Sequence, residues 1–144
     1  MLVHQILRAK PQAEVITVKP GTSVSDAARL LAERRIGAVI VSDDGLRVMG
    51  ILSERDIVRD LGRRGVACLG DTVDALMTRN IVTCTPNDLA DSVLEKMTAG
   101  RFRHMPVRDA SKRVGIISIG DVVAARMSEL AMEKDALAGM IMGN

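Results

Sequence analysis

The segment Gly50-Ile-Leu-Ser-Glu-Arg-Asp56 recurs later in the chain as Gly115-Ile-Ile-Ser-Ile-Gly-Asp121. Glycine, isoleucine, serine and aspartate occupy the same places in both copies. Upstream, the segment Val-Ile-Thr-Val-Lys-Pro at 15–20 aligns with Ile-Val-Thr-Cys-Thr-Pro at 81–86. The upstream segments are offset by 66 residues and the later ones by 65, so the alignment of the two copies needs only a single one-residue gap. Chance rarely places so many identities in one order, so the chain is an internal duplication, and this decides how its fold is interpreted.

Each copy predicts the same element order, β-α-β-β-α. The predicted strands are 15–18, 37–41 and 48–52 in the first copy, and 81–84, 104–107 and 114–117 in the second. After the first strand, Ser23 with Asp26 predicts a capped helix start, and Asp88 with Asp91 repeats the pattern. A second helix is predicted to begin near Asp56 in one copy and near Asp121 in the other.

One copy of about fifty residues buries too little surface to be stable alone. We therefore expect an α/β (α+β) fold in which two β-α-β-β-α repeats pack about a pseudo-twofold axis, followed by a C-terminal helix. The expected divisions are an N-terminal leader 1–10, repeats 11–69 and 77–132, and a helical tail 133–144. The segments 3–7 and 73–77 share an apolar spacing, and we expect them to dock on opposite halves.

Composition excludes several classes of protein. The 144 residues are 47% hydrophobic and 26% charged with a net charge of +2, which is too small to indicate a nucleic-acid-binding protein. No apolar run approaches a membrane span, the N-terminus does not resemble a signal peptide, and two cysteines make no disulfide framework. We expect a cytoplasmic protein. With one Phe and no Tyr or Trp, a flat ligand is expected to lie against aliphatic, Met, His or Arg side chains.

These segments resemble the CBS domain, which is named for cystathionine β-synthase and occurs in tandem pairs that sense nucleotides. The resemblance covers about residues 11–132, and its marks include the Arg-His-Met-Pro-Val strand at 103–107. It implies a stand-alone, non-catalytic regulatory module with AMP, ATP or NAD(H) bound between the repeats, and S-adenosylmethionine less expected. It also implies a homodimer and an unidentified regulated partner, with no role for nucleic acid or a membrane.

The resemblance also implies roles for particular residues. Asp56 and Asp121 would bond the ribose hydroxyls, a serine three residues before each would support ribose or phosphate, and the backbone around two threonines would hold the adenine edge. Arg103 and His104 would lie at the phosphate. The complete candidate set is Thr17, Ser53, Arg55, Asp56, Thr83, Arg103, His104, Met105, Pro106, Ser118 and Asp121.

The chemistry of these residues suits a nucleotide, although simpler interpretations exist. A carboxylate accepts hydrogen bonds from two neighbouring ribose hydroxyls, and a helix start attracts phosphate. Arg55 could reach a phosphate, whereas its counterpart Gly120 could not, so the two sites are expected to be unequal. The Ser-x-x-Asp spacing could equally serve helix capping alone. His104 could be an ordinary histidine at a strand end.

No catalytic or metal-binding pattern is present. The chain has two histidines, no HExxH, and no phosphate-binding GxxxxGK[ST] loop, so we expect neither an enzyme nor a metal site. The tail carries an approximate heptad of apolar residues, interrupted at Lys134: Val123, Met127, Leu130, Leu137 and Ile141. It could pack on its own domain, pair with a second copy, or act as a scaffold without any ligand.

Overall fold

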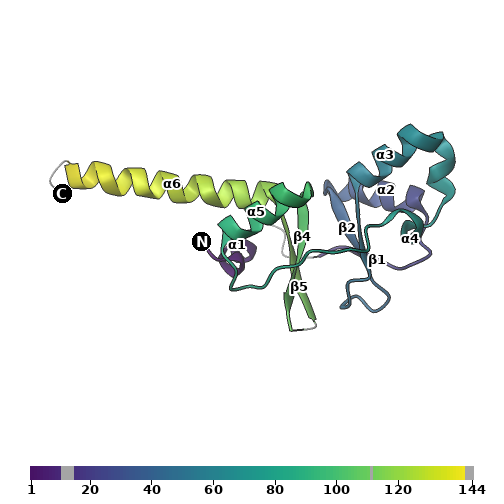
Figure 1. Cartoon of the computed structure of the whole chain (residues 1–144), viewed down its shortest axis with the longest axis horizontal. Helices are drawn as coiled ribbons and strands as arrows, with labels where there is room; N and C mark the ends of the chain where they lie inside the picture. Colours follow the sequence, from purple (N-terminus) through teal and green to yellow (C-terminus); the bar gives the residue numbers. More distant parts are fainter. Residues whose placement is uncertain (11–14, 111, 142–144) are drawn as a thin grey trace.

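The computed structural model describes residues 1–10, 15–110 and 112–141, which form two similar halves and a long projecting helix (Figure 1). The first half contains β1 (Thr17–Val18), α2 (Val24–Arg34), β2 (Ala38–Val41), β3 (Gly50–Ser53) and α3 (Glu54–Arg64). The second contains α5 (Ala90–Gly100), β4 (His104–Asp109), β5 (Lys112–Ser118) and α6 (Ile119–Ile141). Two further helices, α1 (Val3–Ala9) and α4 (Val73–Leu76), precede the halves, and a 3-10 helix spans Gly65–Gly70. The predicted mixed fold of two repeats with a C-terminal helix is confirmed.

The two halves differ in one strand. In the first, β1 runs parallel to β2, which pairs antiparallel with β3. In the second, β4 and β5 form an antiparallel pair, and the predicted strand 81–84 is reduced to one parallel bridge between Cys84 and Val107. Pro106 explains the difference. Its counterpart Ile40 donates its N–H to Ile16 O at 3.3 Å, whereas proline has no N–H with which to extend the ladder.

The two first helices of the repeats begin differently. Ser23 caps α2 as predicted, since its side chain accepts a hydrogen bond from the Asp26 N–H at 3.1 Å. The predicted Asp88 cap is wrong, because α5 begins at Ala90 and the Asp88 carboxylate instead accepts from the Thr85 N–H at 2.9 Å. The Ala90 N–H, near the start of α5, donates to Met1 O at 2.9 Å, so the N-terminal segment satisfies one of its amides.

Each short leading helix completes the core of the opposite half. Val3 and Ile6 of α1 are buried in the core of the second half, whereas Val73 and Met77 at α4 are buried in the core of the first. The Val3 N–H also donates to Asp88 O at 2.9 Å. The crossed docking expected from the sequence is therefore confirmed, and it ties the two halves together.

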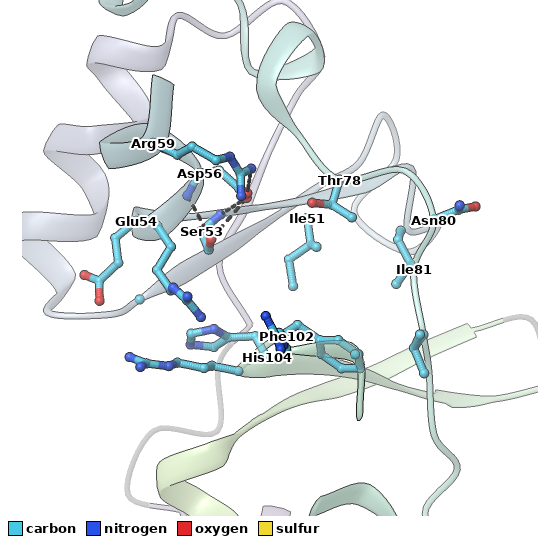
Figure 2. A pocket seen from close by; sticks show the side chains of 16 residues that line it. Ile51, Ser53, Glu54, Asp56, Arg59, Thr78, Asn80, Ile81, Phe102 and His104 are labelled. Carbon is cyan, nitrogen blue, oxygen red and sulfur yellow. Dashed lines mark hydrogen bonds and ion pairs between the residues drawn. The ribbon is translucent and has the colours of Figure 1, made fainter. Parts of the chain in front are cut away.

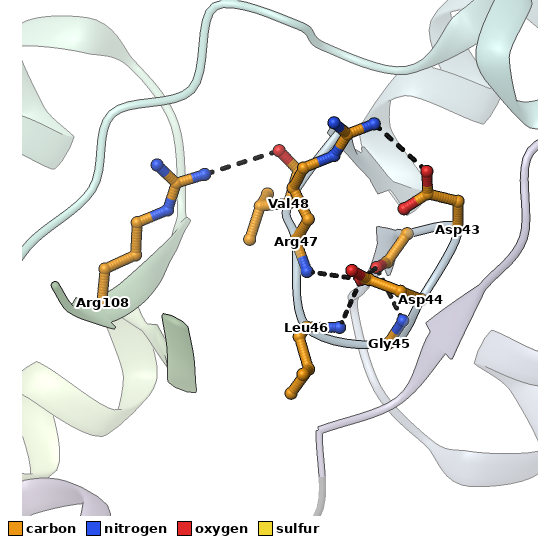
Figure 3. Close-up of polar contacts among 8 residues, drawn as sticks. Asp43, Asp44, Gly45, Leu46, Arg47, Val48 and Arg108 are labelled. Atoms are coloured by element: carbon orange, nitrogen blue, oxygen red, sulfur yellow. Dashed lines mark hydrogen bonds and ion pairs between the residues drawn. The ribbon is translucent and has the colours of Figure 1, made fainter. Parts of the chain in front are cut away.

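Two arginines of the second half donate hydrogen bonds to the hairpin loop of the first, and Figure 3 shows one of them, Arg108. Arg108 donates to Val48 O at 3.4 Å, and Arg113 donates to Gly45 O at 2.5 Å. The loop is pre-shaped by Asp44, whose carboxylate accepts from the backbone N–H groups of Leu46 at 2.8 Å and Arg47 at 2.7 Å. These backbone hydrogen bonds hold the pKa of Asp44 below its ordinary value. The contacts therefore help to fix how the halves face each other.

Only the first turns of helix α6 pack against the second half, and the rest of the helix projects away from it (Figure 1). Val122 and Ala125 are its buried residues, and Arg126 forms an ion pair with Glu129 at 3.2 Å. The heptad residues beyond them are exposed, so the helix does not pack along its length on its own domain. No helix in the described part of the chain is long and apolar enough to cross a membrane.

Candidate functional site

A cavity of about 400 Å³ opens between the two halves (Figure 2). It is lined by the ends of β3 and the start of α3 on one side, and by the turn that leads into β4 on the other. A segment after α4 closes the third side. The lining residues are Gly37, Ile51, Ser53, Glu54, Arg55, Asp56, Arg59, Thr78, Asn80, Ile81, Val82, Gly100, Arg101, Phe102, Arg103 and His104.

The serine and aspartate of the first repeat form a reciprocal cap at the start of α3. The Asp56 N–H donates to Ser53 Oγ at 3.2 Å, and the Ser53 N–H donates to Asp56 Oδ2 at 2.9 Å. The capping interpretation is thus confirmed as geometry. Capping leaves the carboxylate at the cavity wall, where Asp56 is 8% exposed. A carboxylate held in place at this position is chemically suited to accept hydrogen bonds from hydroxyl donors.

Opposite Asp56, the turn into β4 brings cationic and aromatic side chains to the cavity. This turn follows Arg101, which ends α5 in the left-handed conformation with φ 56°, as Arg35 ends α2 with φ 54°. Arg103, His104 and Phe102 all line the cavity. The chain therefore places anion-binding groups across from a hydroxyl acceptor.

His104 reaches across to the first half. A Cβ on Gly37 would lie 2.9 Å from His104 Cε1, so any larger residue at position 37 would require the imidazole to shift. Burial lowers the pKa of His104, although the charges of Glu54 and Asp121 oppose this shift while Lys10 and Arg103 add to it. The imidazole is therefore neutral at neutral pH.

The lowered pKa of His104 predicts a pH dependence of stability. Because the folded state binds the proton more weakly, the unfolded state takes up more protons once the pH falls below about 6.5. The free energy of unfolding should fall as the pH drops from 7.5 to 5.5, and the His104→Gln variant should show a flatter profile. Urea unfolding at several pH values measures this, with His4→Gln as the matched control. A His104→Gln profile as steep as that of the wild type would contradict the expectation.

The aligned aspartate of the second repeat has a different environment. Asp121 accepts from the Ser118 N–H at 2.9 Å, and its N–H donates to Ser118 Oγ at 3.1 Å, which repeats the cap. Its Oδ2, however, lies 3.0 Å from Lys10 Nζ, which also donates to Ile116 O at 2.9 Å. A lysine of the leading segment thus neutralises this carboxylate. The two aligned carboxylates therefore lie in different environments.

The predicted residues separate into two groups. Ser53, Arg55, Asp56, Arg103 and His104 all line the cavity, although they come from opposite halves. The rest do not line it: Thr17, Thr83, Met105, Pro106, Ser118 and Asp121. Met105 does not line the cavity because its side chain points into the core of the second half, where it is fully buried. Pro106 points to the opposite face of β4 and is buried as well.

The polypeptide before Thr83, rather than Thr83 itself, forms the third wall. Thr78 pairs with Ile51 through two backbone hydrogen bonds of 2.9 and 3.1 Å, which carries the following residues past the cavity. Asn80, Ile81 and Val82 then line it. This wall offers apolar side chains with backbone polar groups beside them, which suits a planar heterocycle.

Several lining residues were missed from the sequence. Phe102, the single aromatic residue of the chain, lies at the cavity, so the expectation of walls without aromatic side chains is wrong. Its position directly before Arg103 was the available signal. Arg59 was also missed, because an arginine three residues after an aspartate resembles an ordinary surface ion pair on a helix.

Neither metal chemistry nor thiol chemistry emerges from the described residues. In that part of the chain, no group of three or more His, Cys, Asp or Glu side chains is placed to hold a metal ion. Cys68 and Cys84 are free and buried. Burial raises the pKa of the Cys84 thiol to about 11, so it is protonated at neutral pH.

The family model, the curated relatives and the similar solved structures all point to the same family of domains. The model of the CBS domain matches residues 4–63 and 73–128. A CBS-domain protein from Agrobacterium tumefaciens is 44% identical, with a TM-score of 0.83 over 88% of this chain and 99% of that one. The chain spans about a quarter (24%) of the length of the first curated relatives it matches, which are CBS domain-containing proteins of Arabidopsis thaliana.

Two similar solved structures contain adenosyl ligands. CBSX2, in complex with AMP, is 29% identical with a TM-score of 0.72, over 88% of this chain and 96% of that one. The domain pair of MJ0100, in complex with 5′-methylthioadenosine and S-adenosyl-L-methionine, is 28% identical with a TM-score of 0.77, over 90% and 98% of the two chains.

Proposed function

The chain belongs to the CBS-domain family, and from this we propose that it is a regulatory module that binds an adenine nucleotide in the cavity between its halves. CBS-domain proteins are generally regulatory and non-catalytic. The observation that carries the proposal is the juxtaposition of Asp56 with Arg103 and His104 across one cavity. A ribose needs a hydroxyl acceptor, which Asp56 supplies, and a phosphate needs hydrogen-bond donors, which the Arg103 guanidinium and the neutral imidazole of His104 can supply.

The proposed pose follows from the three walls. The ribose hydroxyls lie at Asp56, the phosphate faces Arg103 and His104, and Arg55 approaches it from the start of α3. The adenine lies along Ile81 and Val82, within reach of Phe102. AMP, ATP and NAD(H) share this adenosine phosphate portion, and AMP is the smallest ligand that contains it. We propose one such ligand in this cavity, in a protein of the cytoplasm.

Because the ligand contacts both halves, its binding would favour one arrangement of them. A partner that reads this arrangement would respond to occupancy, provided that the ligand binds its two states unequally. The contacts that join the halves at the opposite end, from Arg108 and Arg113 to the hairpin loop, would act as the pivot.

Calorimetric titration with AMP, ATP, NADH and S-adenosylmethionine tests the proposal. We expect saturable binding of at least one adenine nucleotide, with a dissociation constant in the micromolar range. Absence of binding for all four ligands, with folded protein, would refute the nucleotide proposal. It would favour the alternative of a scaffold that acts through its C-terminal helix.

We also propose that α6 pairs with the same helix of a second copy. Its apolar residues follow a heptad spacing that is interrupted only at Lys134, and Met127, Leu130 and Leu137 are exposed. The double variant Leu130→Glu with Leu137→Glu should therefore reduce the molar mass measured by light scattering from that of two chains to that of one. Ala136→Glu, on the opposite face of the helix, should leave it unchanged. A wild type that is monomeric at high concentration would refute the pairing.

A further inference from the structure

The carboxylate of Asp56 is already occupied by groups of the protein (Figure 2). Its Oδ2 accepts from the Ser53 N–H at 2.9 Å and from Ser53 Oγ at 3.1 Å, and its Oδ1 accepts from Arg59 Nη2 at 2.7 Å. A carboxylate has about four acceptor positions, so three are filled. A ribose needs two acceptor positions for its neighbouring hydroxyls, and it therefore has to displace one of these donors.

Arg59 is the donor that can leave at the lowest cost. The hydrogen bonds from Ser53 belong to the cap of α3, and breaking them would destabilise the first turn of this helix. Asp56 is buried, but the Arg59 side chain is 58% exposed, so its guanidinium can leave the carboxylate and remain hydrated. Its guanidinium also lines the cavity, so it remains beside any ligand after it has left Asp56.

We propose that Arg59 makes the cavity selective for phosphate-bearing ribonucleosides, by exchanging Asp56 for the phosphate when the ligand binds. The inference rests on the proposed nucleotide function and specifies its ligand class. A neutral nucleoside must break the ion pair between Arg59 and Asp56 and leaves the guanidinium without an anionic partner. A nucleotide breaks the same pair but supplies a phosphate, which binds a guanidinium through charge-assisted hydrogen bonds.

The same arrangement disfavours cationic adenosyl ligands. Four arginines line the cavity, namely Arg55, Arg59, Arg101 and Arg103. The sulfonium of S-adenosylmethionine would add a positive charge to this set, whereas a phosphate is attracted by it. The residue aligned with Arg59 in the second repeat is Ala124, so this exchange of ion-pair partners is proposed for the first repeat alone.

Titration of the wild type and of Arg59→Ala with adenosine and with AMP tests the inference. Without Arg59, adenosine no longer competes with an ion pair, and we expect it to bind about threefold more tightly. AMP loses a guanidinium partner, and we expect it to bind about tenfold more weakly. The preference for AMP over adenosine should therefore fall by about thirtyfold. Arg59→Gln, which keeps a donor without the charge, should lose this preference as well.

Arg63→Ala is the matched control, because it removes the same charge from an exposed position on the same helix. We expect it to leave the preference unchanged. A change of the same size and direction for both ligands in Arg59→Ala, or tighter AMP binding, would overturn the selectivity role while leaving nucleotide binding intact. A wild type that binds none of AMP, ATP and NADH would overturn the proposed function, and the selectivity role with it.

Discussion

AMP is expected to bind about thirtyfold more weakly when Asp56 is replaced by asparagine. The asparagine oxygen can still accept from the Ser53 N–H, so the cap of α3 is largely kept. The charge that strengthens the hydrogen bonds from the ribose hydroxyls is lost, which corresponds to about 2 kcal/mol. Calorimetry with AMP measures the loss, and thermal unfolding verifies that the variant is folded.

The second repeat provides the control for this substitution. Asp121→Asn makes the same chemical change in the same type of cap, but at a carboxylate that is paired with Lys10 and does not line the cavity. We expect it to change AMP affinity by less than about threefold, as is usual for groups that do not touch the ligand. Equal losses in the two variants, or a loss in Asp121→Asn alone, would contradict the assignment of the ligand to the Asp56 cavity.

Replacing Val3 with aspartate should lower the free energy of unfolding by about 3 kcal/mol or more. Val3 is 0% exposed and lies in the core of the second half, where an unpaired carboxylate loses its hydration. Val3 is also the first residue of α1, where an acidic side chain would favour the isolated helix. A large destabilisation would therefore arise from the docking of α1 and not from its intrinsic helix stability. Urea unfolding measures the difference.

Val58→Asp is the control for this prediction, since Val58 is 65% exposed on α3 and is not among the residues that line the cavity. We expect it to change the free energy of unfolding by less than about 0.5 kcal/mol. Hydrogen exchange should in addition show faster exchange in β4 and β5 of the Val3→Asp variant than in the first half. Equal stability of the two variants would contradict the crossed docking of the leading helices.

Most of the fold could be predicted because the sequence pattern of each element occurs twice in the duplicated chain. Helical spacing, the Ser23 cap and alternating apolar residues are local signals, and the structure bears them out. The errors arose where a distant segment intervened. Pro106 removes a hydrogen bond that residues 81–84 needed, and Met1 supplies a partner for the start of α5 that Asp88 was expected to provide.

The candidate site was harder to predict than the fold. Residues that belong to a repeated motif, such as Asp56, could be recognised from their counterparts. The alignment could not indicate that Lys10 pairs with Asp121, because the two are more than a hundred residues apart in the sequence. The second repeat has no arginine aligned with Arg59, and the first has no phenylalanine aligned with Phe102. The repeat therefore gave no signal for these two residues, and their place at the cavity is seen only in the folded structure.

The most direct test of the central claim is a crystal structure of the chain grown with AMP. The account predicts one AMP between the halves, with its ribose hydroxyls within hydrogen-bond distance of the Asp56 carboxylate and its phosphate at Arg103 and His104. AMP bound instead at Asp121 or on the outer surface would contradict the account. A cavity without AMP, at a ligand concentration that saturates a micromolar site, would contradict it as well.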